Sequence, residues 1–128
     1  MTAPPIEMVL LKQVASYLAM PIFVVDAEGA LVYYNEPAEE LLGHRYEETG
    51  QLPLETWGRL WTPTDAQGEP LPPERLPLGI AVRERRPSQE TMWIRGLDGV
   101  TRRITITAIP LDGRTSELLG ALAFFWES

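Results

Sequence analysis

Apolar residues recur at intervals of three and four over the first segment of the chain, between Ile6 and Leu18. This period matches one face of an α-helix, so the pattern predicts an amphipathic helix within residues 1–19. The apolar stripe consists of Ile6, Val9, Leu10, Val14, Tyr17 and Leu18. Such a helix has to bury its apolar face, and the pattern leaves two possibilities open. The helix covers the sheet of its own domain, or it forms a dimer contact.

The hydrophobic pattern after this segment is that of β-strands. Residues 22–25 and 30–34 are short runs rich in branched and aromatic side chains. The turn-forming sequence Asp26–Gly29 separates them. Two strands joined by so short a turn form an antiparallel hairpin.

A polar residue directly after the hairpin marks the start of a short helix. Asn35 is a natural N-cap, because its side-chain oxygen can accept from the first free amides of a helix. Pro37 is tolerated in the first turn of this helix, residues 38–42 complete its two turns, and Gly43, a residue free to adopt the left-handed conformation, ends it.

Proline and glycine dominate the middle of the chain, from residue 44 to 73, and prevent any long element there. One short helix is expected around residues 54–60. A better helix runs from Leu76 or Pro77 to about Arg85, because Pro77 suits a first helical turn and Pro87 prevents continuation.

The last third of the chain alternates polar and apolar residues and is predicted to be all strand. Strands are expected over residues 89–95, 102–109 and 118–126. Asp98-Gly99 forms the first turn between them, and Pro110, Asp112 and Gly113 break the chain before the last strand. The whole order predicts an α+β fold, with a five-stranded antiparallel sheet and short helices across one face.

Composition narrows the classes of function. The chain has 128 residues, the length of one domain, and no cysteine, so disulfides and thiolate chemistry are excluded. Its net charge of −7 repels phosphate backbones and anionic headgroups, so neither nucleic acid nor membrane is an expected partner. There is no signal-peptide pattern and no membrane-spanning apolar run, and we expect a cytoplasmic protein.

Several local patterns, in this order and spacing, resemble a PAS domain. Residues 25–35 resemble the opening hairpin of that family, and residues 38–43 resemble the helix that follows it. Residues 70–82 resemble a variant common in bacterial sensors. Asp98-Gly99, residues 109–111 and Gly120-Ala121 resemble the joints of the last three strands. The resemblance covers residues 20–127 and implies a PAS domain over residues 20–128, with residues 1–19 as a flanking helix.

The resemblance implies a pocket between the inner face of the sheet and the helices. The strand positions placed on the inner face are Phe23, Val25, Leu31, Tyr33, Met92, Ile94, Ile104, Ile106, Ala108, Ala121, Ala123 and Phe125. The helical side is expected to contribute Leu42, Trp57, Trp61, Ile80 and Val82, and Tyr33 and Asn35 are the expected polar groups of the cavity. Such a set either binds a small apolar or aromatic molecule or packs on itself.

The opposite face of the same strands is also apolar and needs a cover. Its residues are Ile22, Val24, Thr105, Thr107, Ile109, Leu122, Phe124 and Trp126. The N-terminal stripe is the expected cover, from the same chain or from a partner. Since related domains often dimerise through this surface, we predict a homodimer that uses Val9, Leu10, Val14 and Tyr17 together with the apolar residues of this face.

Cofactors of known PAS subfamilies can be compared with the residues present. Covalent flavin photochemistry needs a cysteine and is excluded, and the apolar Ile94 and Ile104 disfavour non-covalent flavin. Haem needs an axial ligand. The single histidine, His44, follows a helix-ending glycine. It does not lie on the central helix, which is expected from Leu76 or Pro77 to about Arg85, so haem is disfavoured. The identity of any cofactor stays open.

Catalytic and metal signatures are not found in the sequence. One histidine without cysteine cannot form a usual zinc site, and no calcium loop, phosphate-binding glycine loop or serine elbow is present. We therefore predict a non-catalytic sensory domain that binds a small ligand and signals through a dimer surface. The alternative is a ligand-free interaction module. The chain is either a stand-alone domain or the sensor piece of a larger kinase, cyclase or transcription regulator.

Overall fold

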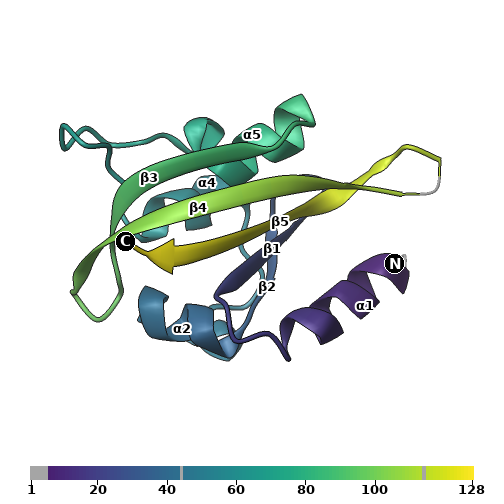
Figure 1. Ribbon diagram of the computed structural model, residues 1–128, viewed down its shortest axis with the longest axis horizontal. Coiled ribbons are helices and arrows are strands. Elements are labelled where there is room, and N and C mark those ends of the chain that lie inside the picture. The colour runs from purple at the N-terminus through teal and green to yellow at the C-terminus, as the bar shows by residue number, and fades with distance from the viewer. Residues whose placement is uncertain (1–5, 44, 114) are drawn as a thin grey trace.

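The structure is a computed structural model that describes residues 6–43, 45–113 and 115–128. Its elements are α1 (Ile6–Ala15), β1 (Ile22–Asp26), β2 (Leu31–Tyr34), α2 (Glu36–Leu42), α3 (Tyr46–Thr49), α4 (Leu54–Leu60), the 3-10 turn η1 (Pro73–Arg75), α5 (Pro77–Glu84), β3 (Ser88–Arg95), β4 (Thr101–Asp112) and β5 (Leu118–Glu127). The strands form one antiparallel sheet in the order β2-β1-β5-β4-β3 (Figure 1). The predicted fold class is confirmed. The interpretation of His44 lies outside the described residues.

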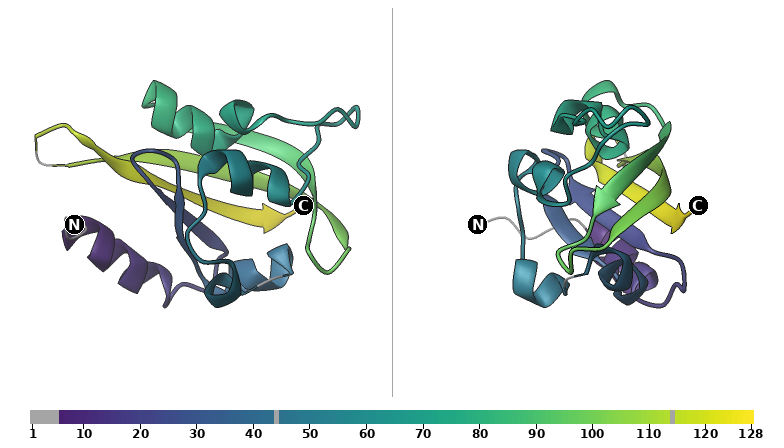
Figure 2. Two further views of the ribbon diagram at one scale, coloured as in Figure 1. Left: turned by 180° about the vertical axis from the view of Figure 1, so that it is seen from behind. Right: turned by 90° about the vertical axis from the view of Figure 1, so that its left-hand side faces the viewer.

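Different helices cover the two faces of the sheet. Helices α4 and α5 lie on one face, which we call the inner face, and α1 lies on the opposite, outer face (Figures 1 and 2). Apolar side chains of the inner face and of α4 and α5 form the main core, while Met8 of α1 joins Ile22, Val24 and Leu122 in a smaller cluster on the outer face.

The β1–β2 hairpin forms where the sequence predicts it, because Asp26 organises the turn. One carboxylate oxygen of Asp26 accepts from the backbone N–H groups of Glu28, at 3.0 Å, and of Ala30, at 2.9 Å. Gly29 has a φ of +86°, a conformation that residues with a Cβ rarely adopt.

Asn35 caps α2 as predicted, and it does more than cap. Its side-chain oxygen accepts from the N–H of Ala38 at 3.3 Å and from the N–H of Ile22 at 2.9 Å. Its amide donates to the carbonyl of Met20 at 2.9 Å. The fully buried Asn35 therefore ties the start of α2 to the start of β1.

The prediction for the last strands was wrong at Pro110. The sequence places a chain break at Pro110 and Asp112, whereas β4 continues through both residues and pairs with β5 as far as Asp112. β3 pairs with β4 only as far as Ala108. Beyond that point β4 has a free edge, where a proline without an N–H donor is tolerated.

The prediction for the first helix needs two corrections. It ends at Ala15 instead of Leu18. The face that packs on the sheet also differs from the predicted one. Met8 is buried against the sheet and Leu11 is half-buried. At 100° per residue Met8 lies opposite the centre of the predicted stripe, and Leu11 lies beside its edge at Leu18. The stripe residues are the exposed ones, with Leu10 53 % and Val14 56 % exposed.

Candidate functional site

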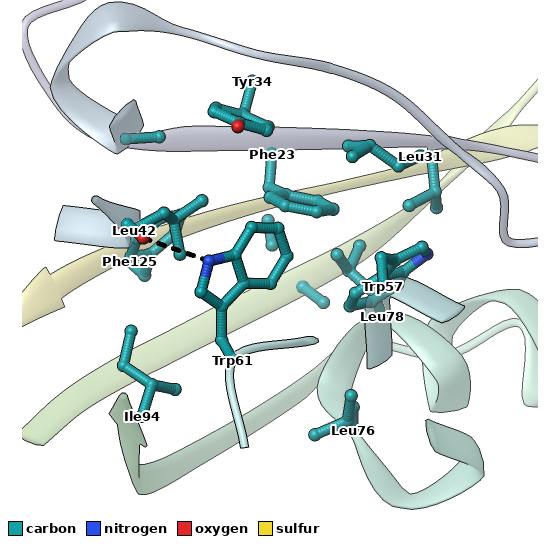
Figure 3. Packing of buried hydrophobic residues seen from close by; sticks show 14 of the residues in the cluster. Phe23, Leu31, Tyr34, Leu42, Trp57, Trp61, Leu76, Leu78, Ile94 and Phe125 are labelled. Atoms are coloured by element: carbon teal, nitrogen blue, oxygen red, sulfur yellow. Dashed lines mark hydrogen bonds between the residues drawn. The ribbon is translucent and has the colours of Figure 1, made fainter. Parts of the chain in front are cut away.

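A small cavity lies between the inner face of the sheet and the helices α4 and α5. Its volume is about 60 Å³. The residues that line it are Phe23, Leu42, Trp57, Gly58, Trp61, Pro63, Leu76, Pro77, Leu78, Met92, Ile94, Ile104, Ile106, Ala123 and Phe125. Figure 3 shows how the large side chains converge on this space from the strands and from the helices.

Two tryptophans line the cavity between the sheet and the helices. Trp57 lies on α4 and Trp61 directly follows that helix. Both rings contact Phe23 of β1, with centroid distances of 4.9 Å for Trp57 and 5.9 Å for Trp61. Each indole N–H donates to a backbone carbonyl, Trp57 to Gly29 at 2.8 Å and Trp61 to Leu42 at 3.1 Å (Figure 3 for Trp61). The tryptophans are therefore fixed at both the ring and the polar end.

The chemistry of the cavity is apolar throughout. Among the described residues, no charged, hydroxyl or amide side chain lines it, and both indole N–H groups are already bonded. Pockets for drug-sized molecules measure roughly 300–1,000 Å³ and place a few polar groups to orient the ligand. The residues present fit neither that description nor a flavin, whose ring needs polar partners and a far larger space.

Ten of the eighteen predicted pocket residues line the cavity, and eight do not. Leu31, Ala108 and Ala121 are buried in the core around it, and Val82 packs against that core. Val25 is buried in the core on the inner face but is not part of the lining. The side chain of Asn35 is hydrogen-bonded to backbone groups of other residues and does not line the cavity. Ile80 is half-buried, and its neighbours Leu78 and Ala81 face the core in its place.

Tyr33 was placed on the wrong face. The register of β1 and β2 shifts between Val24 and Val25, so that Phe23 pairs with Tyr34 while Val25 pairs with Leu31. This irregularity brings both Leu31 and Tyr34 to the inner core and leaves Tyr33 packed against the outer cluster. Strict alternation along β2, on which the prediction relied, cannot anticipate such a shift.

A cluster of tyrosines lies beside this irregularity. The ring of Tyr46 contacts Tyr33 at 5.6 Å and Tyr34 at 5.5 Å between centroids. The pKa of Tyr33 is raised, first by burial and then by the nearby charges of Glu39 and Glu36. Burial also raises the pKa of Tyr46. Both phenols therefore stay protonated at neutral pH and act as packing groups.

The sequence reasoning missed the wall of the cavity that α4, η1 and α5 form together. The missed residues are Gly58, Pro63, Leu76, Pro77 and Leu78. An available signal was the run of apolar residues at the start of the predicted central helix. The close approach of the three elements, which depends on glycines facing Pro73, leaves no periodic pattern in the sequence.

The outer face holds a second apolar hollow, between the end of α1 and strands β1 and β5. This groove has a volume of about 470 Å³. It is lined by Leu11, Val14, Leu18, Ala19, Met20, Ile22, Leu122 and Phe124. Of the predicted dimer residues on the sheet, Ile22, Val24 and Leu122 are buried beneath α1, while Trp126 is 38 % exposed. The groove continues directly into the exposed stripe through Val14 and Leu18.

Within residues 6–43, 45–113 and 115–128, no group of three or more histidine, aspartate or glutamate side chains is arranged to hold a metal ion. No helix in that same part of the chain is both long and apolar enough to span a bilayer.

Comparison with known proteins identifies the fold. The sequence profile of the PAS fold matches residues 10–126. Among solved structures, the chain is similar to the PAS domain of Bordetella pertussis BvgS (17% identity, TM-score 0.64, 95% of this chain and 85% of that one). It is also similar to the Rhodobacter sphaeroides LOV protein (17%, TM-score 0.74, 96% and 68%). The light-state dimer of the fungal blue-light photoreceptor Vivid is a further match (15%, TM-score 0.67, 99% and 97%). No curated protein matches the sequence.

Proposed function

The chain belongs to the PAS family of sensory and signalling domains, and from this premise we propose that it is a non-catalytic regulatory domain that works by pairing with a second copy of itself. The surface that we propose for the contact is the exposed stripe of α1 together with the groove beside it. This assignment keeps the predicted homodimer and most of the predicted contact residues, and it leaves out Val24 and Trp126, which lie in neither the stripe nor the groove.

The observation that carries the proposal is the concentration of exposed apolar side chains on one short segment. Seven large apolar side chains between Ile6 and Met20 are 43–82 % exposed, with Tyr17 the most exposed of them. They are Ile6, Val9, Leu10, Val14, Tyr17, Leu18 and Met20. Single exposed apolar residues are normal on a protein surface, but a contiguous group of this kind marks an interaction site.

The extent of this surface suits a second copy. At ~100–200 Å² per fully exposed side chain, the seven side chains present roughly 400–750 Å² of apolar area. Two copies that meet through the same surface would bury roughly 800–1,500 Å², which reaches the range of specific interfaces at about 1,200 Å². A two-fold contact needs one self-complementary patch, and an apolar stripe beside an apolar groove provides it.

The helix can serve two purposes at once because its two faces are both apolar. Met8 and Leu11 pack against the sheet of the same chain, whereas Leu10 is exposed and Val14 lies at the edge of the groove. A change in the domain that shifts α1 on its sheet would therefore move the proposed dimer contact. We place this activity in cytoplasmic bacterial signalling, with an output domain or a partner protein reading the dimer.

The test replaces two stripe residues and leaves Met8 and Leu11, which pack on the sheet, unchanged. We expect sedimentation velocity to show a dimer for the unaltered protein and a monomer for Leu10→Glu/Val14→Glu, with the same helical content by circular dichroism. Gln67→Glu is the control, since it adds a charge at an exposed polar position in a turn away from α1, and it should remain a dimer. A monomeric parent protein, or a double variant that still dimerises, would exclude this contact.

A second candidate function, sensing a very small apolar molecule, rests on the inner cavity. A dry apolar cavity of about 150 Å³ is known to admit benzene or xenon, and the cavity here is about 60 Å³. It therefore suits an occupant smaller than benzene. Native mass spectrometry, compared with the denatured protein, is the measurement. An extra mass lost on denaturation supports the sensor, and a clean dimer without added mass supports the interaction module alone.

A further inference from the structure

The two cavity tryptophans connect the cavity to two different parts of the structure, the β1–β2 turn and the end of α2. Trp57 and Trp61 are four residues apart, about one helical turn, and both contact Phe23. Their indole N–H groups point in different directions. Trp57 donates to the carbonyl of Gly29 in the β1–β2 turn, and Trp61 donates to the carbonyl of Leu42 at the end of α2.

The end of α2 is the point where the β3–β4 hairpin is attached. The carbonyl of Leu42 accepts from the backbone N–H of Leu97 at 2.9 Å in addition to the indole of Trp61. The carbonyl of Leu41 accepts from the guanidinium of Arg102 at 2.9 Å. The last carbonyls of a helix have no partner within the helix. Here they are satisfied by one residue of the cavity wall and by two residues of one hairpin.

The same junction is packed so closely that a movement on one side has to be followed on the other. A Cβ added to Gly43 would lie 2.8 Å from the backbone nitrogen of Asp98. Asp98 in turn lies 3.5 Å from the guanidinium of Arg102. Leu42 also lines the cavity, beside Trp61. The cavity wall and the attachment of the hairpin are therefore formed by the same residues.

We infer that Trp61 is the positioning residue through which a change at the inner cavity reaches the β3–β4 hairpin, while Trp57 carries such a change to the β1–β2 turn. A small apolar occupant, or a rearrangement that accompanies pairing, displaces the indole rings. The displacement weakens the bond of Trp61 to Leu42 and loosens the hairpin at Leu97. The inference rests on the proposed regulatory role for its biological meaning.

Each tryptophan is the matched control for the other. Phenylalanine keeps an aromatic ring at either position and removes the N–H donor. We expect Trp61→Phe to speed amide hydrogen exchange at Leu97 by about threefold to tenfold, which corresponds to one ordinary hydrogen bond, and to leave Gly29 unchanged. Trp57→Phe should give the reverse result. An equal increase at both amides in either variant, or no increase at Leu97 in Trp61→Phe, would overturn the inference.

A second variant keeps both tryptophans and alters the far wall. Leu78→Val removes one methylene from α5, away from both attachment points. We expect it to speed exchange at Leu97 in the parent protein but not in the Trp61→Phe background. A response at Leu97 that persists in that background, or that is missing in the parent, contradicts transmission through Trp61. The exchange rates at Leu97 and Gly29 can be measured whether or not the protein dimerises. The sedimentation experiment therefore tests the proposed dimer contact independently of this inference.

Discussion

The helical wall of the cavity makes a prediction that reverses the usual effect of a substitution. Gly79 lies within α5, where alanine normally favours the helix by about 1 kcal/mol. In this structure, however, a Cβ at Gly79 would overlap the backbone carbonyl oxygen of Pro73 in η1, well inside the 3.0 Å that real Cβ contacts keep. A backbone oxygen cannot rotate away as a side chain can, so η1 or α5 has to move.

The magnitude follows from the opposition of these two effects. Forcing extra volume into a well-packed core costs about 1–3 kcal/mol, and the gain in helix propensity offsets up to about 1 kcal/mol of it. We expect Gly79→Ala to lower the free energy of unfolding by roughly 1–2 kcal/mol, which is roughly 3–8 °C in Tm for a domain of this size. Urea unfolding followed by tryptophan fluorescence measures the change.

A second glycine provides an internal comparison. A Cβ at Gly58 of α4 would meet the side chain of Pro73 at 2.9 Å. Gly58→Ala should therefore cost less than Gly79→Ala, and Pro73→Ala should partly rescue Gly58→Ala but not Gly79→Ala. A Gly79→Ala protein as stable as the parent would refute the packing of α4, η1 and α5 described here, and with it the geometry of the cavity wall.

Three further changes test other parts of the structure. Asn35→Ala should lower the free energy of unfolding by about 2–4 kcal/mol in urea, because the helix loses its cap and the buried N–H of Ile22 loses its acceptor. Arg85→Gly should raise Tm, since Arg85 has a φ of 53° at the end of α5, where glycine relieves about 0.5–1 kcal/mol. The pKa of Asp98 is lowered, chiefly because its carboxylate accepts from the N–H of Val100, so its contribution to stability is present above its ordinary pKa of 3.8 and is lost as the pH falls below it. Thermal unfolding of Asp98→Asn should accordingly depend less on pH in this acid range than that of the parent.

The order of elements was readable from the sequence because each boundary has a local cause. Asp26 organises its turn, Asn35 caps α2 and Gly43 ends it in the left-handed conformation. These causes act within a few residues, so a single sequence shows them. The break expected at Pro110 was wrong because it depended on where the neighbouring strand β3 ends, which is a property of pairing between distant segments.

The candidate site was predictable as a set but not in its details. Alternation along β3, β4 and β5 correctly assigned Met92, Ile94, Ile104 and Phe125 to the inner face. Alternation failed at Tyr33, because a shift of register reverses the faces of a strand.

For α1, the apolar spacing was real but did not show which face packs on the sheet. Both faces of the helix are apolar, and Met8 and Leu11 occupy the packed one. The spacing of apolar residues in a helix does not indicate which of two apolar faces packs on the sheet.

The central claim is that two copies meet through the exposed stripe of α1, and disulfide cross-linking between introduced cysteines tests it most directly. The chain has no cysteine of its own, so each variant carries one thiol. Leu10→Cys, Val14→Cys and Tyr17→Cys are oxidised separately, with Gln67→Cys in an exposed turn away from α1 as the control. The account predicts rapid formation of a covalent dimer at one or more stripe positions and none at Gln67. Cross-linking no faster at the stripe than at Gln67 would contradict it.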